Sequence, residues 1–192
     1  MADALALLAY DSVAAGLSAI DVMVKEAPVT VLEANLVEPG RFLILFSGGV
    51  AEVEASHRVA VERFSDALLA DILLPMVHPA LIAGLGGKED RSPPDTLGVV
   101  EGKTVAHTLV AADRSLKDAQ VRLAGIRVAV GLGGRAFYVV HGEQHDVEAS
   151  VAAGATILEA AGTLHRTEII ARPHAEMVPW LLRTAPFKLG HP

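Results

Sequence analysis

The segment HGEQH, residues 141–145, brings together residue types that can bind a metal ion. It holds two imidazoles, His141 and His145, with the carboxylate of Glu143 between them, and both groups are common zinc ligands. The order departs from His-Glu-x-x-His, in which two histidines lie one turn apart on a helix. The segment also falls where a strand is expected to turn into a helix, and polar residues are ordinary there. We therefore expect no metal ion and no cofactor.

Other residues capable of chemistry lack the neighbours that the chemistry needs. Ser56 and Ser150 are expected inside helices, and neither stands in the Gly-x-Ser-x-Gly sequence that exposes a nucleophile on a sharp turn. The sequence GLGG occurs at 84–87 and at 131–134, without the Lys and Ser or Thr of a P-loop. The first instance is more simply part of a linker. No grouping of acid, base and nucleophile emerges, so we expect a protein that is not an enzyme.

Composition excludes further classes of function. The chain has 192 residues, 52% of them hydrophobic, and a net charge of −7 with no block of Lys or Arg, so we expect no nucleic-acid partner. It contains no cysteine, which excludes disulfides, thiolate zinc sites and cysteine-bound iron–sulfur clusters. No apolar run is long enough to cross a bilayer, and no basic residue precedes Lys25. These features favour a soluble cytoplasmic protein with no membrane partner.

The chain repeats itself with an offset of 92 residues. The phrase DVMVKEAPV, residues 21–29, returns as DRSLKDAQV, residues 113–121, with the same Asp, Lys, Ala and Val positions. The phrase VEAS occurs at 53–56 and again at 147–150, where the offset has become 94. An ordered series of matches with small gaps indicates a duplicated domain rather than one layer of a solenoid.

The duplication divides the chain into four parts. We expect domains at 1–82 and 96–178, a linker rich in Gly, Pro and charge at 83–95, and a tail at 179–192. The tail contains Trp180, Leu181, Leu182 and Phe187. Such an apolar cluster is expected to pack on a neighbouring subunit or on its own domain.

Hydrophobic periods predict the same order of elements in each copy. In the first copy a short alternating strand at 5–11 precedes a helix that Ser12 caps and Pro28 ends. Two strand-like runs, 29–37 and 41–48, are joined by the turn EPG. A second helical stripe and a closing strand at 70–77 follow; the stripe consists of Val53, Ala60, Phe64 and Leu68.

The second copy repeats this order, beginning with a strand near 97–100 and a helix through Val105, Leu109, Ala112 and Leu116. Strands near 121–130 and 135–140, a helix from about Asp146 and a strand at 167–172 complete it. Each copy is therefore predicted to be a βαββαβ domain of ferredoxin-like type, with two helices on one face of an antiparallel sheet. The fold class is α+β.

These features together resemble a known family. The pattern Asp-x-x-x-Lys-x-Ala-x-Val, the glycine-bearing hairpin between the second and third strands, and the closing IIARPH are similar to the bacterial microcompartment (BMC) shell domain. Two copies in one chain resemble the tandem-domain shell proteins, which trimerise into a pseudo-hexameric tile. The elements follow the usual, non-permuted order, and this favours a tile of a single layer.

The resemblance assigns five residues to the tile edge. In the family, the lysine of the motif lies along the edge against its counterpart in the next tile, which implies this place for Lys25 and Lys117. An edge arginine that enters the neighbouring tile corresponds to Arg172, followed by His174. The first copy has Met76, Val77 and His78 where the second has Arg172, Pro173 and His174, so alternate edges should differ in strength.

The resemblance also implies a central pore lined by two hairpins, 37–41 and 130–135. The expected lining residues are Glu38, Pro39, Gly40, Arg41, Gly131, Leu132, Gly133 and Gly134. Three copies of Glu38 would form a negative ring, and exposed backbone amides beside the glycines favour polar or anionic solutes. Some tandem tiles hold an iron–sulfur cluster on this axis through cysteines, and the absence of cysteine excludes that role here.

The sequence thus favours a structural tile in a bacterial microcompartment shell within the cytoplasm. Its expected partners are two further copies in a homotrimer, other shell proteins edge to edge, and small solutes in the pore. Two alternatives stay open at this stage. One is a ligand-binding regulatory protein with tandem ferredoxin-like domains, because that fold hosts many functions. The other is an enzyme whose turnover depends on His141 or His145.

Overall fold

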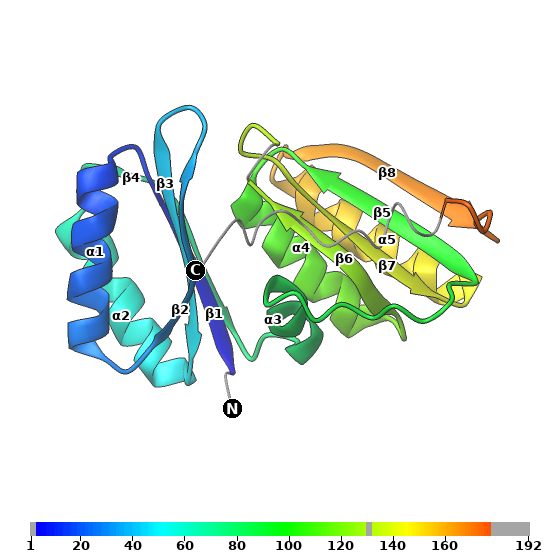
Figure 1. Cartoon of the computed structure of the whole chain (residues 1–192), viewed down its shortest axis with the longest axis horizontal. Helices are drawn as coiled ribbons and strands as arrows, with labels where there is room; N and C mark the ends of the chain where they lie inside the picture. The colour runs from blue at the N-terminus through cyan, green and yellow to red at the C-terminus, as the bar shows by residue number, and fades with distance from the viewer. Residues whose placement is uncertain (1–2, 130–131, 178–192) are drawn as a thin grey trace. The chain divides into compact units, whose positions relative to one another are not determined.

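The structure is a computed structural model that describes residues 3–129 and 132–177. The chain forms two compact units, one that runs through Ile82 and one that starts at Ala83 (Figure 1). Each unit contains one four-stranded antiparallel sheet and two long helices. The two are described separately below.

The first unit has the predicted βαββαβ order. Its elements are β1 (Ala4–Tyr10), α1 (Val13–Glu26), β2 (Thr30–Val37), β3 (Arg41–Gly48), α2 (Val50–Arg63) and β4 (Leu68–Pro75). The strands lie in the order β2-β3-β1-β4, all antiparallel. Both helices cover the same face of the sheet (Figure 1). The two strands that each helix connects are consecutive in sequence but are separated in the sheet by one other strand, and this is the ferredoxin-like arrangement.

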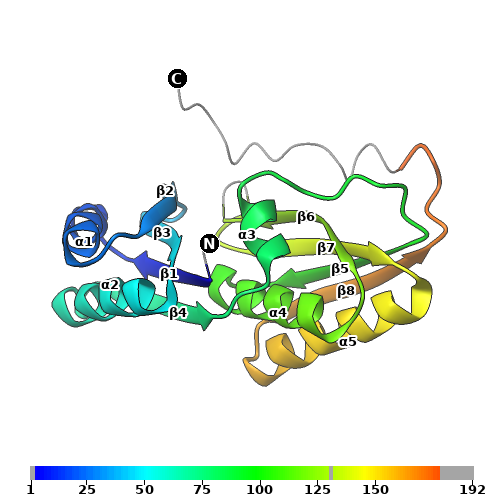
Figure 2. The same cartoon turned by 90° about the horizontal axis from the view of Figure 1, so that it is seen from below.

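The second unit repeats the arrangement. Its elements are β5 (Thr96–Gly102), α4 (Val105–Asp118), β6 (Arg122–Val128), β7 (Ala136–Gly142), α5 (Gln144–Ala160) and β8 (Leu164–Ala171), in the sheet order β6-β7-β5-β8. Helices α4 and α5 run side by side beneath one face of this sheet (Figure 2). The predicted fold class, two ferredoxin-like domains in non-permuted order, is therefore confirmed. A short helix not anticipated from the sequence, α3 (Pro79–Leu85), contains Gly84 of the first GLGG.

Local sequence explains where the first helices begin and end. The Ser12 hydroxyl accepts a hydrogen bond from the Ala15 N–H at 3.3 Å, which confirms the predicted N-cap. In the second unit the Thr104 hydroxyl accepts from the His107 N–H at 3.4 Å. Helix α1 ends at Glu26, before the extended residue Ala27 that precedes Pro28.

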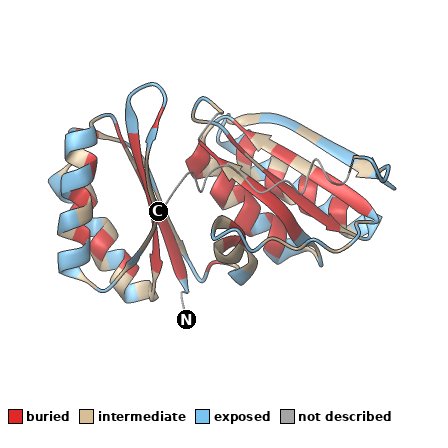
Figure 3. Ribbon diagram, in the orientation of Figure 1, coloured by how far each residue is buried: buried red, intermediate tan, exposed pale blue. Residues whose placement is uncertain are grey.

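The core of the first unit lies between its sheet and its helices. Ala4, Ala6, Leu8 and Tyr10 of β1 pack there with Ala19 and Met23 of α1. The alternate residues of the strand, Leu5 and Leu7, are also fully buried. Figure 3 shows the buried residues concentrated in the sheets and on the inner sides of the helices. Successive strand residues point to opposite faces of the sheet, and both faces of β1 are buried. The strand is therefore apolar at almost every position.

One assignment from the periodic pattern was wrong. The pattern predicts Leu68 in the second helical stripe, but α2 ends at Arg63 and Leu68 begins β4. The chain turns between them, because the N–H of Ala67 bonds to the Phe64 carbonyl and the Ala67 carbonyl accepts from Asp11. An apolar residue four positions after Phe64 fits a continuing helix and a turn followed by a strand equally well.

The repeated VEAS phrase joins the two helices of each unit. The buried Ser56 of α2 donates a hydrogen bond to the Met23 carbonyl of α1 at 2.9 Å. The buried Ser150 of α5 donates to the Ser115 carbonyl of α4 at 3.2 Å. Met23 and Ser115 match at the offset of 92. Both serines are therefore bonded within the core, where neither can serve as an exposed nucleophile.

Candidate functional site

The repeated Asp and Lys form the same ion pair in both units. On α1 the Lys25 ammonium lies 2.7 Å from the Asp21 carboxylate, one helical turn earlier. On α4 the Lys117 ammonium lies 2.6 Å from Asp113. Each lysine stands in the last turn of its helix, where a positive charge also complements the helix dipole. The four-residue spacing of the motif thus pairs each lysine with an aspartate one turn earlier, near the C-terminal end of its helix.

The surroundings of the two pairs differ. The Lys25 side chain is 72% exposed and Asp21 is 61% exposed, whereas Lys117 is 38% exposed and Asp113 only 9%. An exposed lysine has freedom that a half-buried one lacks. The two ion pairs therefore match in sequence and in helix position but differ in exposure.

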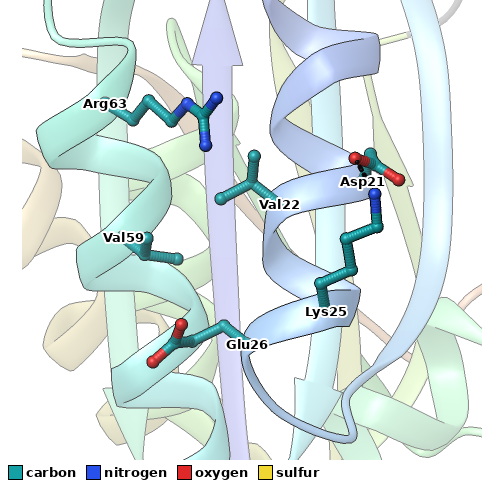
Figure 4. A pocket seen from close by; sticks show the side chains of 6 residues that line it. All are labelled: Asp21, Val22, Lys25, Glu26, Val59 and Arg63. Carbon is teal, nitrogen blue, oxygen red and sulfur yellow. Dashed lines mark hydrogen bonds and ion pairs between the residues drawn. The ribbon is translucent and has the colours of Figure 1, made fainter.

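A hollow of about 350 Å³ lies beside Lys25, between α1 and α2. Figure 4 shows Val59 and Arg63 extending from α2 and Val22 and Glu26 from α1, while Lys25 turns toward Asp21. Charges of both signs surround the hollow. This lining suits a polar contact with another protein surface better than an apolar ligand.

The residue after the last strand of each unit has a positive φ. Met76 follows β4 with φ of 53°, and Arg172 follows β8 with φ of 50°. In each case a histidine two residues later accepts a backbone hydrogen bond on its Nδ1: His78 from the Ala80 N–H at 3.2 Å, and His174 from the Glu176 N–H at 3.3 Å. The two histidines therefore order their own turns.

The first predicted pore hairpin joins β2 to β3. Glu38, Pro39, Gly40 and Arg41 are all exposed, and the Glu38–Pro39 peptide is cis. Gly40 has φ of 69°, in the left-handed region that glycine adopts without steric cost. The hairpin thus presents a carboxylate and a guanidinium at the end of the sheet.

The second predicted hairpin joins β6 to β7. It is closed by hydrogen bonds from the Leu132 N–H to the Ala129 carbonyl and from the Arg135 N–H to the Leu132 carbonyl, at 3.1 and 3.2 Å. Gly133 and Gly134 have φ of 60° and 79°. Gly131, also predicted to line the pore, lies outside the described residues.

The two histidines of HGEQH do not come together. His141 is the penultimate residue of β7 and is 4% exposed, with its Nε2 3.0 Å from the Asp90 carboxylate. His145 lies on α5 with 74% of its side chain exposed, near Glu143 and Asp146. Within residues 3–129 and 132–177, no group of three or more His, Asp or Glu side chains is arranged to hold a metal ion.

The partner of His141 belongs to a segment that sequence reasoning treated as a linker. We call residues 88–92 the strap. Its Glu89 is 3% exposed and lies 2.7 Å from the Arg127 guanidinium of β6, and the Asp90 N–H donates to the Leu123 carbonyl at 2.9 Å. The strap is therefore fixed to the sheet of the second unit. The charges in KEDRS and the two arginines on β6 were the only sequence signal for it.

Asp90 is the central acceptor of the strap. It accepts hydrogen bonds from the hydroxyl and the backbone N–H of Ser92, and the Arg122 guanidinium lies 3.7 Å from its carboxylate. The Ser92 hydrogen bonds, followed by the charge and hydrogen bond of His141, hold the pKa of Asp90 below its usual value. The carboxylate therefore stays ionised at neutral pH.

No helix in the described part of the chain combines the length and the apolar character that crossing a bilayer requires.

Comparisons with known proteins agree with this geometry. The sequence profile of the BMC domain matches twice, at residues 4–77 and 96–173. The bacterial microcompartment shell protein PduT of Citrobacter freundii is 31% identical over 177 residues, which cover 92% of this chain and 96% of PduT. The carboxysome shell protein CsoS1 of Prochlorococcus marinus is 44% identical over 86 residues, covering 44% of this chain and 82% of CsoS1.

A solved structure extends the likeness to the whole fold. The crystal structure of a microcompartment protein from Desulfitobacterium hafniense DCB is 34% identical and superimposes with a TM-score of 0.86, over 91% of this chain and 97% of that one. Two sheets of the same order, two profile matches and a relative aligned over 92% of the chain support one assignment. The chain is a tandem-domain member of the bacterial microcompartment shell protein family.

Proposed function

We propose that three copies of this chain close into a pseudo-hexameric tile that packs edge to edge in a microcompartment shell and acts as a structural protein rather than an enzyme. The observation that carries the proposal is the matched placement of the two edge motifs. Lys25 and Lys117 occupy the last turn of equivalent helices with the same ion pair. A chain with two such edges supplies six edges when three copies form a ring.

The edge contact follows from the chemistry of the lysine side chain. A long aliphatic stem can lie flat along a neighbouring tile while its ammonium donates to backbone carbonyls. Lys25 is exposed enough to do so, and its hollow with Glu26 and Arg63 adds further charge to that edge. Arg172 would add a planar guanidinium to one edge only, with His78 and His174 shaping the turns beside it.

The central pore is the second part of the proposal. The hairpins that begin at Glu38 and Leu132 would alternate around the threefold axis, and Gly40 and Gly133, which carry no side chain, would allow the backbones to approach closely. Three Glu38 carboxylates would disfavour anions at one level of the pore. Small solutes would pass there. The shell in which the tile sits would lie in the cytoplasm, with other shell proteins at its edges.

Oligomeric mass and microscopy test the tile directly. The purified protein should sediment with the mass of three 20.1 kDa chains and form flat layers or tubes at raised concentration. Lys25→Ala should impair layer growth and leave the trimer intact, while Arg166→Ala, an exposed change on β8, should leave both unchanged. A single-chain mass, or isolated particles under every condition, would contradict the proposal and favour a ligand-binding regulatory protein.

A further inference from the structure

A hollow of about 290 Å³ lies at one end of the second sheet, beside the β6–β7 hairpin, and has both charged and apolar lining residues. It is lined by Glu101 of β5, Ala136 and Phe137 of β7, and Leu132 and Arg135 of the adjoining hairpin. Glu101 and Phe137 are directly opposed in the β5–β7 ladder, so their side chains share one face. That face is the one opposite the helices, because the neighbouring Gly102 faces Thr108 of α4.

His165 of β8 connects the two charged residues of the hollow. Its Nε2 lies 3.3 Å from Nη1 of Arg135 and 3.8 Å from the Glu101 carboxylate. It stands at the irregularity where the β5–β8 register shifts, between the partners of Gly102 and Glu101. The Nε2 atom of His165 therefore lies near both the Arg135 guanidinium and the Glu101 carboxylate.

The contacts fix which groups are available to a ligand. A guanidinium can only donate, so the Arg135 contact requires an unprotonated Nε2 on His165. That nitrogen then has no hydrogen for Glu101. Within the described residues, no other hydrogen bond reaches the Glu101 carboxylate, and Arg135 has four further N–H groups. Both charged groups are thus open to an added molecule.

We propose that this hollow binds a small zwitterion of the α-amino carboxylate type. Arg135 would receive the carboxylate, Glu101 the ammonium, and Phe137 would pack against the side chain of the ligand. A simple anion would be attracted by Arg135 but repelled by Glu101, and a simple amine would meet the reverse. A molecule with both charges on adjacent carbons satisfies the two groups at once.

The first unit lacks this site, which makes the second unit the specialised one. The ladder positions that match Glu101, Phe137 and His165 hold Ala9, Leu43 and Leu69. Only the hairpin arginine is shared, as Arg41. The difference gives a control residue within the same chain. The proposal does not depend on tiling, although the site would select a solute if the β6–β7 hairpin lines a pore.

Titration of the full-length protein with three related probes tests the proposal. L-alanine carries both charges, propionate lacks the ammonium and ethylamine lacks the carboxylate. The imidazole NMR signals of His165, assigned with a His165→Gln sample, should shift with L-alanine and saturate with a Kd on the order of 1–10 mM. Propionate and ethylamine should bind at least about tenfold more weakly, because each loses one charged contact.

Two substitutions and one matched control assign the roles. Arg135→Gln should weaken L-alanine binding at least about tenfold, and Glu101→Gln should let propionate bind as tightly as L-alanine, since the repulsion is gone. Arg41→Gln should change nothing. Circular dichroism and sedimentation would show that each variant keeps its fold and mass.

Several results would overturn the zwitterion site, and the unmodified protein alone can give two of them. The first is the absence of a saturable shift with L-alanine, and the second is propionate binding as tightly as L-alanine. An equal loss in Arg41→Gln and Arg135→Gln would do so as well. Because binding is read in solution and layers are read by microscopy, failure of this site and failure of the proposed tile are separate outcomes.

Discussion

At the scale of single residues, the packing between α4, α5 and β7 depends on a glycine. The Ser115 hydroxyl donates to the Ser150 carbonyl at 2.6 Å, so the hydroxyl of the buried Tyr138, 2.6 Å away, must donate to Ser115. Both groups lie against Gly154 of α5, where an added Cβ would stand 1.9 Å from the Tyr138 Oη and 2.6 Å from the Ser115 Oγ. A side chain cannot enter without displacing this network.

Gly154→Ala should therefore lower the free energy of unfolding by about 1–3 kcal/mol, the usual cost of an added group in a packed core. Denaturant unfolding measures it. Tyr138→Phe removes the atom nearest the new methyl group, so Gly154→Ala should cost less in a Tyr138→Phe background. Equal costs in the two backgrounds would show that the glycine is not needed to accommodate the tyrosine.

The two tyrosines of the chain, Tyr10 and Tyr138, are both fully buried, and they predict a response to alkali. Burial, with a further contribution from the Asp71 charge, raises the pKa of Tyr10 to about 12, and burial also raises the pKa of Tyr138. The unfolded chain ionises its tyrosines near pH 10. Stability is thus full below about pH 10 and falls as pH rises toward 12, because only the unfolded state releases these protons.

Near-ultraviolet absorbance should then show no phenolate between pH 10 and 11 while the fold persists, and phenolate should appear together with loss of the circular dichroism signal. Protein unfolded in urea serves as the control, with a midpoint near pH 10. A midpoint near 10 in folded protein would mean that at least one tyrosine is reached by water.

At the scale of elements, the strap is held by a buried ion pair that a single substitution can break. Glu89 and Arg127 are 3% and 15% exposed. Arg127→Gln leaves the Glu89 carboxylate buried without its counter-charge, and breaking such a pair costs about 3–5 kcal/mol. We expect unfolding free energy to fall by that order in the second domain. Trypsin should also cleave faster after Lys88 and Arg91, because the strap would detach.

The exposed pair of Arg166 and Glu168 offers the matched control for the strap. Arg166→Gln removes an equivalent charge at the surface and should change stability by less than about 1 kcal/mol. Adding Glu89→Gln to Arg127→Gln should recover part of the loss, since it removes the uncompensated charge. If Arg127→Gln and Arg166→Gln behave alike, the strap contributes little to the domain.

Periodic elements could be predicted from the sequence, and contacts between distant segments could not. The predicted strand at 41–48 matches β3, and Ser12 and Pro28 delimit α1, because these signals are local. The strap had the composition of a linker, and its attachment depends on where the sheet register places Arg127. Glu101, Arg135 and His165 are likewise separated in sequence. Only the strand order β7-β5-β8 makes them neighbours.

At the scale of the whole molecule, duplication has kept the fold of the two domains and let their surfaces diverge. Both sheets have the same strand order, yet Lys25 is far more exposed than Lys117, and only the second domain has the Glu101 and His165 pair. A ring of three such chains would have threefold rather than sixfold symmetry at its edges and around its axis. Any property that depends on Arg172 would therefore alternate around such a ring.

An arginine can be introduced in the first domain at Met76, the position that matches Arg172. Met76 is 71% exposed and has φ of 53°, close to the 50° of Arg172, so Met76→Arg adds a guanidinium without new backbone strain. If the proposed tile is correct, the added donors should strengthen the weaker edge and lower the protein concentration at which layers form several-fold, as read by sedimentation and electron microscopy. Met76→Gln, similar in length but uncharged, should leave that concentration near the original value. Equal behaviour of the two variants would mean that this position does not face a neighbouring tile.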